Sequence, residues 1–210
     1  FLFAYVGVSG MPAWNKVSNA KSGRDYATYH YAVAEALDGG DPYDTRSLSK
    51  RARAEKTRKS VHPYFYPPPF LALMTWADFV DLATGYKSFF LLNQLALFGC
   101  LVVFRRWFGA PWILLGALAL SFTPITDNAK MGQANVLVML AAVAGLWRNS
   151  GALVGAAAMA KMSPALYLFA WMSRRKWRPV LSAVLFAVLS SVLVLPLVEF
   201  DAQWRFYTDI

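Results

Sequence analysis

The sequence has a single cysteine, Cys100, and only two histidines, His30 and His62, which lie far apart in its 210 residues. One thiol cannot form a disulfide within the chain, and it excludes a zinc site built from several cysteines. Two distant histidines do not predict a histidine-rich metal cluster either. The sequence therefore predicts neither a disulfide framework nor a metal centre.

Charged residues are also missing from long stretches of the chain, and residues 181–198 contain none. Hydrophobic residues make up 57% of the sequence, against about 45–50% in average soluble proteins. The net charge of +9 comes from Lys and Arg that lie between apolar runs, which is typical of membrane-protein loops. We expect a membrane protein surrounded by lipids and no nucleic-acid partner.

The apolar runs predict an all-α fold, a polytopic bundle of transmembrane helices. Residues 1–13 are too short to cross a bilayer, which takes about 20 helical residues, so we interpret them as the end of a first membrane helix of a longer protein. Residues 70–80 are also short and are interpreted as re-entrant or interfacial. Further membrane helices are expected at residues 86–106, 111–126, 133–148 and 177–198, with a broken helix pair at 150–174.

The polar residues 14–85 between these runs predict one large loop that contains helices. Asp25 is placed to cap a helix over Tyr26–Leu37, and two glycines follow it as a stop signal. Asp41–Asp44 has the composition of a turn. A second, strongly basic helix is expected over Ser47–Lys59, where it would face solvent or lipid headgroups or, as the alternative, bind a phosphate of the substrate.

The orientation is argued from the basic residues of the short connections, which favour the cytoplasmic side of a membrane. Arg105-Arg106, Arg148 and Arg174-Arg175-Lys176 would then lie inside, and the loop 14–85 outside. Residues 150–174 must in that case leave and return on the same side, as a hairpin broken at 161–164, where Pro164 interrupts the helix. Simple alternation of single spans is the competing topology.

Several polar groups would meet at the outer face in this topology. Lys161 is the most informative, because a charge inside an apolar segment costs about 2.5–3.5 kcal/mol and usually faces a cavity or a partner. A phosphate or carboxylate partner and a lysine that reaches water from a helix end are both compatible with its position. The other groups are Asp25, the Tyr66-Pro67-Pro68-Pro69 run, and the Lys130-Met131-Gly132-Gln133-Ala134-Asn135 run.

These motifs, taken in order, resemble glycosyltransferase family 87, whose members use polyprenol-phosphate sugars. The family pattern is an Asp-aromatic pair, G-x-x-P-Y, Y-P-P, G-Q-x-N and K-x-x-P. The matching segments here are DYATYHYAVAEALDGGDPYD from Asp25, YPPPF from Tyr66, KMGQAN from Lys130 and KMSP from Lys161. The general type is that of the mannosyltransferases of this family.

The resemblance implies a GT-C architecture, with a seven-helix module and a large first extracytoplasmic loop. It implies that Asp25 is the catalytic general base, in a multi-pass protein of a bacterial plasma membrane. The donor would be a polyprenyl-phosphate sugar, usually mannose, and the acceptor a lipid or glycan, with no cofactor and no metal. Candidate substrate-binding residues are Arg24, Tyr29, Tyr66, Lys130, Gln133, Asn135 and Lys161.

Two features depart from the family pattern. The match covers only the N-terminal part of a family whose members are about twice as long, and the segment Thr45–Val61 is longer and more basic than expected. The main alternative function is a transporter or flippase for a lipid-linked or anionic substrate, because broken helices with polar residues at the break are typical of transporters. The sugar, the acceptor and the linkage stay open.

Overall fold

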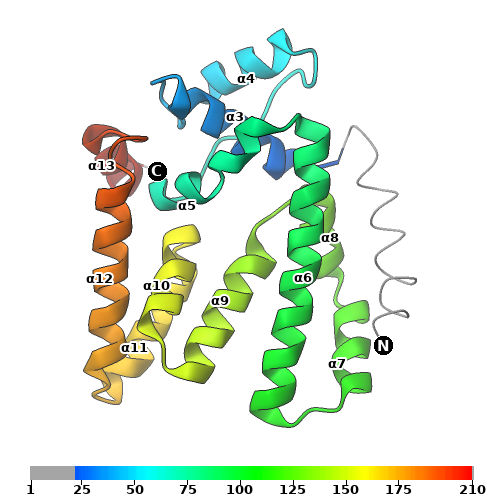
Figure 1. Cartoon of the computed structure of the whole chain (residues 1–210), viewed down its shortest axis with the longest axis vertical. Helices are drawn as coiled ribbons and strands as arrows, with labels where there is room; N and C mark the ends of the chain where they lie inside the picture. The colour runs from blue at the N-terminus through cyan, green and yellow to red at the C-terminus, as the bar shows by residue number, and fades with distance from the viewer. Residues whose placement is uncertain (1–21, 210) are drawn as a thin grey trace.

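The computed structural model describes residues 22–209, and this part of the chain is built from α-helices and two short 3-10 helices, without strands (Figure 1). The all-α prediction is therefore confirmed. The α-helices are α3 (Arg24–Leu37), α4 (Thr45–Ala54), α5 (Pro68–Leu73), α6 (Leu82–Phe108), α7 (Trp112–Ser121), α8 (Thr123–Met131), α9 (Asn135–Arg148), α10 (Gly151–Ala160), α11 (Leu166–Ser173), α12 (Trp177–Leu193) and α13 (Phe200–Asp209); the 3-10 helices are η2 (Thr75–Phe79) and η3 (Ser163–Ala165).

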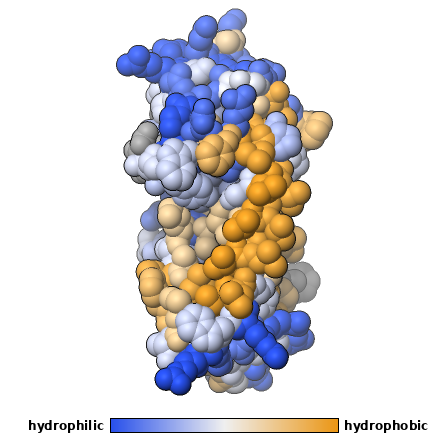
Figure 2. Space-filling view, turned by 90° about the vertical axis from the view of Figure 1, so that its left-hand side faces the viewer, coloured by the Kyte–Doolittle hydropathy of each residue, from blue (hydrophilic) through white to orange (hydrophobic). Residues whose placement is uncertain are grey.

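The helices form a bundle with a cap at one end (Figure 1), and this end is polar on the face shown in Figure 2. In the bundle α9 packs against both α6 and α10, and α10 packs against α12. The cap consists of α3, α4 and α5, with α3 packed against α4, α5, η2 and the first part of α6. The buried core around α3 is rich in aromatic side chains, among them Tyr26, Tyr29, Tyr64 and Phe89.

The basic connections gather at the end of the bundle opposite the cap (Figure 1). Arg105 and Arg106 close α6, and Arg148 closes α9. The turn from α11 to α12 joins the same end, because Lys176 Nζ donates to Asn149 Oδ1 over 3.0 Å. The chain thus brings together the basic residues that the sequence analysis assigned to one side of a membrane.

On the face shown in Figure 2, a broad apolar area lies between the two polar ends. On α12 the exposed side chains Leu181, Leu185, Val188 and Val192 follow one helix face. Among the described helices, α6 alone has the length and hydropathy of a membrane span, since 27 residues extend about 40 Å against a hydrocarbon core of about 30 Å. The helices α7, α9, α10 and α12 are apolar but shorter.

Two local predictions are corrected by the structure. The expected helix 111–126 is two helices, because the backbone is extended at Phe122 and α8 begins at Thr123, directly before Pro124. The basic helix ends at Ala54, and Lys56 has a positive φ of 56°. The predicted end of a first membrane helix, 1–13, lies outside the described residues.

Asp25 does not cap α3 as the sequence suggested. The helix begins at Arg24, its N-cap is Gly23 with a φ of 71°, and no side chain caps it. Asp25 lies in the first turn, where the partial positive charge of a helix N-terminus favours a carboxylate. The break expected at 161–164 is present as η3 between α10 and α11.

Gly132 fixes the start of α9 against α3. It ends α8 with a φ of 70°, which is costly for any residue with a Cβ atom. A Cβ at this position would also lie 2.7 Å from Tyr26 Cβ and 3.1 Å from Tyr86 Cε2. The turn therefore requires glycine for its backbone conformation and for its closeness to α3.

We predict that Gly132→Ala destabilises the protein by about 2–4 kcal/mol, the sum of a left-handed backbone and an overpacked contact. Gly39→Ala is the matched control, because Gly39 has a φ of 77° but open space where the Cβ would lie. It should cost about 1 kcal/mol. Thermal unfolding in detergent, followed by circular dichroism, measures both, and equal losses would contradict the close packing of Gly132 on α3.

Candidate active site

Asp25 and Gln133 form the first contact of the candidate site. Asp25 is half-buried in the first turn of α3, and its Oδ2 accepts a hydrogen bond of 2.7 Å from Gln133 Nε2. Within residues 22–209, Gln133 is the one hydrogen-bond donor that the protein provides to this carboxylate. Among these described residues, none donates a hydrogen bond to Oδ1.

A line of hydrogen bonds continues from Gln133 to Lys161. Gln133 Oε1 accepts from Asn135 Nδ2 over 2.8 Å, and Asn135 Oδ1 accepts from Lys161 Nζ over 2.7 Å. Each amide therefore accepts from the cationic side and donates toward the carboxylate. The arrangement connects an ammonium to a carboxylate through two oriented amide dipoles, and such networks hold their members in place when every group is satisfied.

Local backbone geometry brings these side chains together. The Gly132 turn is closed by a 3.0 Å hydrogen bond from the Gln133 N–H to the Asn128 carbonyl, and Asn135 is the first residue of α9. Lys161 lies directly after α10 with an extended backbone, φ −155° and ψ 123°. Because the helix stops there, the Lys161 side chain leaves the apolar bundle and reaches Asn135.

A small cavity of about 140 Å³ opens beside Asp25. Tyr29 and Tyr66 form one wall, where the Tyr29 hydroxyl donates to the Tyr66 hydroxyl over 2.6 Å and the rings meet edge to face at 4.9 Å. The Tyr43 hydroxyl donates to the Tyr66 carbonyl over 3.2 Å and holds this residue in place. The complete lining is Asp25, Thr28, Tyr29, His62, Pro63, Phe65 and Tyr66.

Both cavity tyrosines are neutral over the physiological pH range. Burial raises the pKa of Tyr29 well above its usual value of 10.0, and the hydroxyl of Tyr66 and the Asp25 carboxylate add to the effect. Burial likewise raises the pKa of Tyr66, and this effect exceeds the lowering by the hydrogen bond that its hydroxyl accepts from Tyr29. The wall beside Asp25 thus offers phenolic O–H groups, suited to bind a polar ligand without adding charge.

The structure brings six of the predicted site residues together and leaves two apart. Arg24 and Lys130 have exposed side chains that take no part in the line from Asp25 to Lys161. Lys130 contributes its backbone instead, since its carbonyl accepts from the Gly23 N–H and from the Tyr86 hydroxyl. The residues near Asp25 are Tyr29, Tyr66, Gln133, Asn135 and Lys161.

The sequence analysis did not single out the cavity residues His62, Pro63 and Phe65. They reach the site because the Thr28 hydroxyl donates to the His62 carbonyl over 3.2 Å, which fixes this segment along α3. Their one signal in the sequence is their position directly before the Tyr66-Pro67-Pro68 run.

The chain forms a bundle of apolar helices with a polar cap at one end. At the junction of bundle and cap, a carboxylate is joined to a lysine by hydrogen bonds. This arrangement is typical of a membrane protein that binds a polar ligand. Comparison with known families identifies its class: residues 64–210 match the model of glycosyltransferase family 87, and the chain belongs to that family. The predicted family is thereby confirmed. No solved structure matches the chain.

Two curated relatives are mycobacterial proteins, both named polyprenol-phosphate-mannose-dependent alpha-(1-2)-phosphatidylinositol pentamannoside mannosyltransferase. The one from Mycobacterium tuberculosis is 27% identical over 100% of this chain and 50% of its own length. The one from Mycolicibacterium smegmatis is 30% identical over 88% of this chain and 46% of its own length. The chain thus spans about half the length of these relatives.

The buried phenols lead to a prediction for alkaline pH. Because the folded pKa of Tyr66 is raised, the unfolded chain loses this proton first when the pH rises. The free energy of unfolding should therefore be unaffected by Tyr66 below the usual tyrosine pKa and should decrease above it, by about 1.4 kcal/mol per pH unit for each such tyrosine.

Tyr66→Phe removes one of these phenols. Above pH 10 the free energy of unfolding of this variant should therefore decrease less steeply, by about 1.4 kcal/mol per pH unit. Denaturant unfolding in detergent at closely spaced pH values between 9 and 11 measures the slope for both proteins. Identical slopes would show that the Tyr66 hydroxyl is not buried.

Proposed function

We propose that the chain forms the catalytic part of an integral membrane glycosyltransferase that moves a sugar from a polyprenyl-phosphate donor to a lipid or glycan acceptor. The observation that carries the proposal is the hydrogen-bonded line from Asp25 through Gln133 and Asn135 to Lys161. The names of the two relatives favour mannose as the sugar and a phosphatidylinositol mannoside as the acceptor.

In the proposed reaction Asp25 is the general base. An acceptor hydroxyl binds in the cavity, its oxygen attacks the anomeric carbon of the donor sugar, and the bond from that carbon to the phosphate oxygen breaks. The hydroxyl proton moves to Asp25, and the polyprenyl phosphate leaves with the bond electrons. Gln133 supports this role because its amide holds Oδ2 and so orients Oδ1 toward the acceptor.

Lys161 is proposed to stabilise the leaving phosphate. Negative charge grows on the phosphate as the bond to the sugar breaks, and a fixed cation lowers the barrier most in a site with little water. One Lys161 N–H is used by Asn135, and an ammonium has three donors, so two remain for phosphate oxygens. Arg24 and Lys130, which the sequence analysis also suggested, are not needed for this step.

The membrane arrangement is part of the proposal: a GT-C-like, seven-helix module in a bacterial plasma membrane, multi-pass, with the cap outside the cell. It is supported by the separation of the cap and Asp25 from the basic turns, because short basic connections favour the cytoplasmic side. The apolar surface between the two ends (Figure 2) would face lipid. Membership of a glycosyltransferase family favours sugar transfer over the alternative of transport or flipping.

We predict that Asp25→Asn lowers the transfer rate by about 10²–10⁴-fold, because the amide can keep the contact with Gln133 but cannot take a proton. Membrane fractions given radiolabelled polyprenyl-phosphate mannose and acceptor lipid report the rate. Asp201→Asn, an exposed position on α13, is the control and should be active. Transfer at the normal rate by the Asp25 variant would exclude the base role.

Lys161→Gln tests whether the charge, rather than the hydrogen bond, is required. Glutamine can still donate a hydrogen bond to Asn135. If Lys161 had only a structural role, the variant would therefore keep its transfer rate. We expect transfer to fall by about 10²-fold or more, the scale found when a charge-stabilising donor is lost, with insertion into the membrane unchanged. Lys176→Gln is the control, since Lys176 makes a similar contact with Asn149 at the opposite end, and it should be active.

A further inference from the structure

A second and larger cavity, of about 850 Å³, lies on the other side of α3 from Asp25. From α3 it is lined by Gly23, His30 and Ala34, whereas Asp25 and Tyr29 face the smaller cavity. At 100° per residue these two sets occupy opposite faces of the helix. The larger cavity is therefore separate from the candidate active site.

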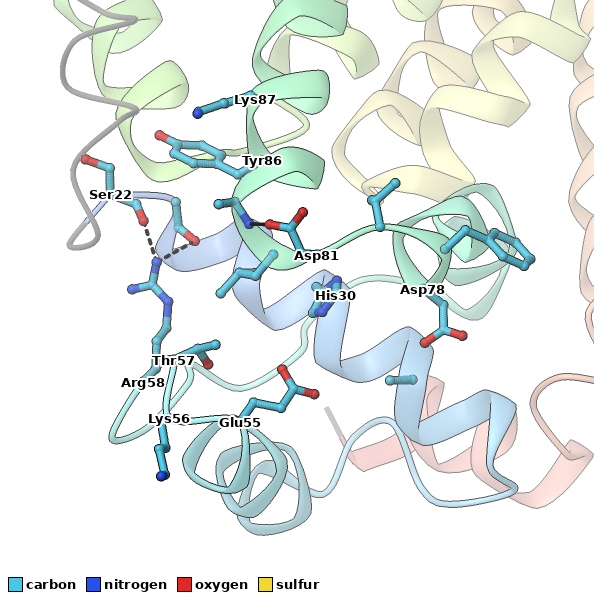
Figure 3. A pocket seen from close by; sticks show the side chains of 16 residues that line it. Ser22, His30, Glu55, Lys56, Thr57, Arg58, Asp78, Asp81, Tyr86 and Lys87 are labelled. Atoms are coloured by element: carbon cyan, nitrogen blue, oxygen red, sulfur yellow. Dashed lines mark hydrogen bonds between the residues drawn. The ribbon is translucent and has the colours of Figure 1, made fainter.

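Arg58 is the most unusual group of this cavity (Figure 3). Its Nη2 donates to the carbonyls of Ser22 and Gly23, while its Nε is buried and has no hydrogen-bond partner. Among the ion pairs of residues 22–209, none includes Arg58, and residues 1–21 contain no Asp or Glu. Burial lowers the pKa of Arg58, and the nearby Arg24 lowers it further.

A half-buried guanidinium without a carboxylate is costly unless an anion joins it. Two further cations line the same cavity, Lys56, which is exposed, and Lys87 in the first turns of α6. Guanidinium groups bind phosphate oxygens through paired N–H donors. The end of the cavity formed by Arg58, Lys56 and Lys87 therefore suits a phosphate group.

The side of the cavity away from Arg58 is acidic and carries Asp81 and Asp78, whereas Glu55 lies beside Lys56 (Figure 3). Asp81 is engaged by the N–H groups of Ala83 and Thr84 as the cap of α6, and Glu55 accepts from the Tyr31 hydroxyl. Asp78 is exposed, and its carboxylate can accept hydrogen bonds from ligand hydroxyls. A ligand that fits both ends carries a phosphate and, some distance from it, donor groups.

The position of the cavity points to a lipid. It is lined by Leu82, Ala83, Tyr86 and Lys87 at the cap end of α6, the one described helix long enough to cross a membrane. Leu91 and Leu95 follow Lys87 on the same face of α6 at intervals of four residues, and both are exposed. A headgroup in the cavity would thus have its acyl chains beside an apolar helix face.

We propose that this cavity binds the headgroup of a phosphodiester lipid that carries hydroxyl groups, with the phosphate at Arg58 and the hydroxyls at Asp78. The site does not depend on the proposed sugar transfer, because its occupation requires no donor. Basic pockets at the ends of membrane helices commonly hold anionic headgroups. Here the carboxylate of Asp78 would also accept hydrogen bonds from headgroup hydroxyls, so a polyol headgroup should bind more tightly than inorganic phosphate.

Isothermal titration of the full chain in detergent micelles tests the proposal with dioctanoyl phosphatidylinositol, dioctanoyl phosphatidylethanolamine and inorganic phosphate as probes. The inositol lipid should bind at least tenfold more tightly than either of the others. Arg58→Gln should weaken its binding about tenfold, and Lys56→Gln, at an exposed position that no fold contact requires, about fivefold. Lys50→Gln, an exposed cation of α4 outside the cavity, is the matched control and should not change binding.

Asp78→Asn separates the two kinds of recognition. It should weaken binding of the inositol lipid but strengthen binding of inorganic phosphate, because it removes a hydroxyl acceptor and a repelling charge together. Equal affinity for the inositol lipid and phosphate would overturn the polyol assignment, and tighter binding of the ethanolamine lipid would do the same. Unchanged binding in both Lys56→Gln and Arg58→Gln would exclude this cavity as the site, whether or not sugar transfer is observed.

Discussion

The close packing of Gly132 against the first turn of α3 is the constraint on which the candidate active site depends. With a φ of 70° and no room for a Cβ beside Tyr26, this turn places Gln133 at the carboxylate of Asp25. From there the hydrogen bonds pass to Asn135 and Lys161. Four side chains from three separate parts of the sequence are thus joined by hydrogen bonds, because glycine at position 132 allows α8 and α9 to approach α3 closely.

The cap helix α3 separates two environments that serve different chemistry. One face carries Asp25 beside two neutral phenols, the buried Tyr29 and the partly buried Tyr66, a setting suited to proton transfer from a hydroxyl. The opposite face lines the larger cavity, where Arg58 forms no ion pair with another described residue. Because a helix presents different residues every 100°, this one element can carry the proposed base and also border the proposed lipid headgroup site. Both faces lie at the end of the bundle away from the basic turns (Figure 1).

Local composition predicted the secondary structure correctly where a single effect decides it, such as hydrophobic burial or the loss of a backbone hydrogen bond at proline. The long, mostly apolar stretch of α6 and the proline that follows Lys161 each predicted the element that is present. Local composition failed where apolar residues continue through a change of direction, as at Phe122 between α7 and α8. It also failed at the end of α4, where the Thr57 hydroxyl binds the Ala52 carbonyl and Tyr31, contacts that a run of basic residues does not reveal.

The sequence by itself determined the helical class, the family and the types of group available for chemistry, because hydropathy and ordered motifs are properties of the chain alone. It also singled out Asp25 and Lys161 as residues to consider together. Only the tertiary structure decided that two amides join them, that Arg24 and Lys130 stay outside this line, and that the half-buried Arg58 has no ion-pair partner within residues 22–209. These are matters of distance between residues up to 108 positions apart, and they follow from how helices pack rather than from any local pattern.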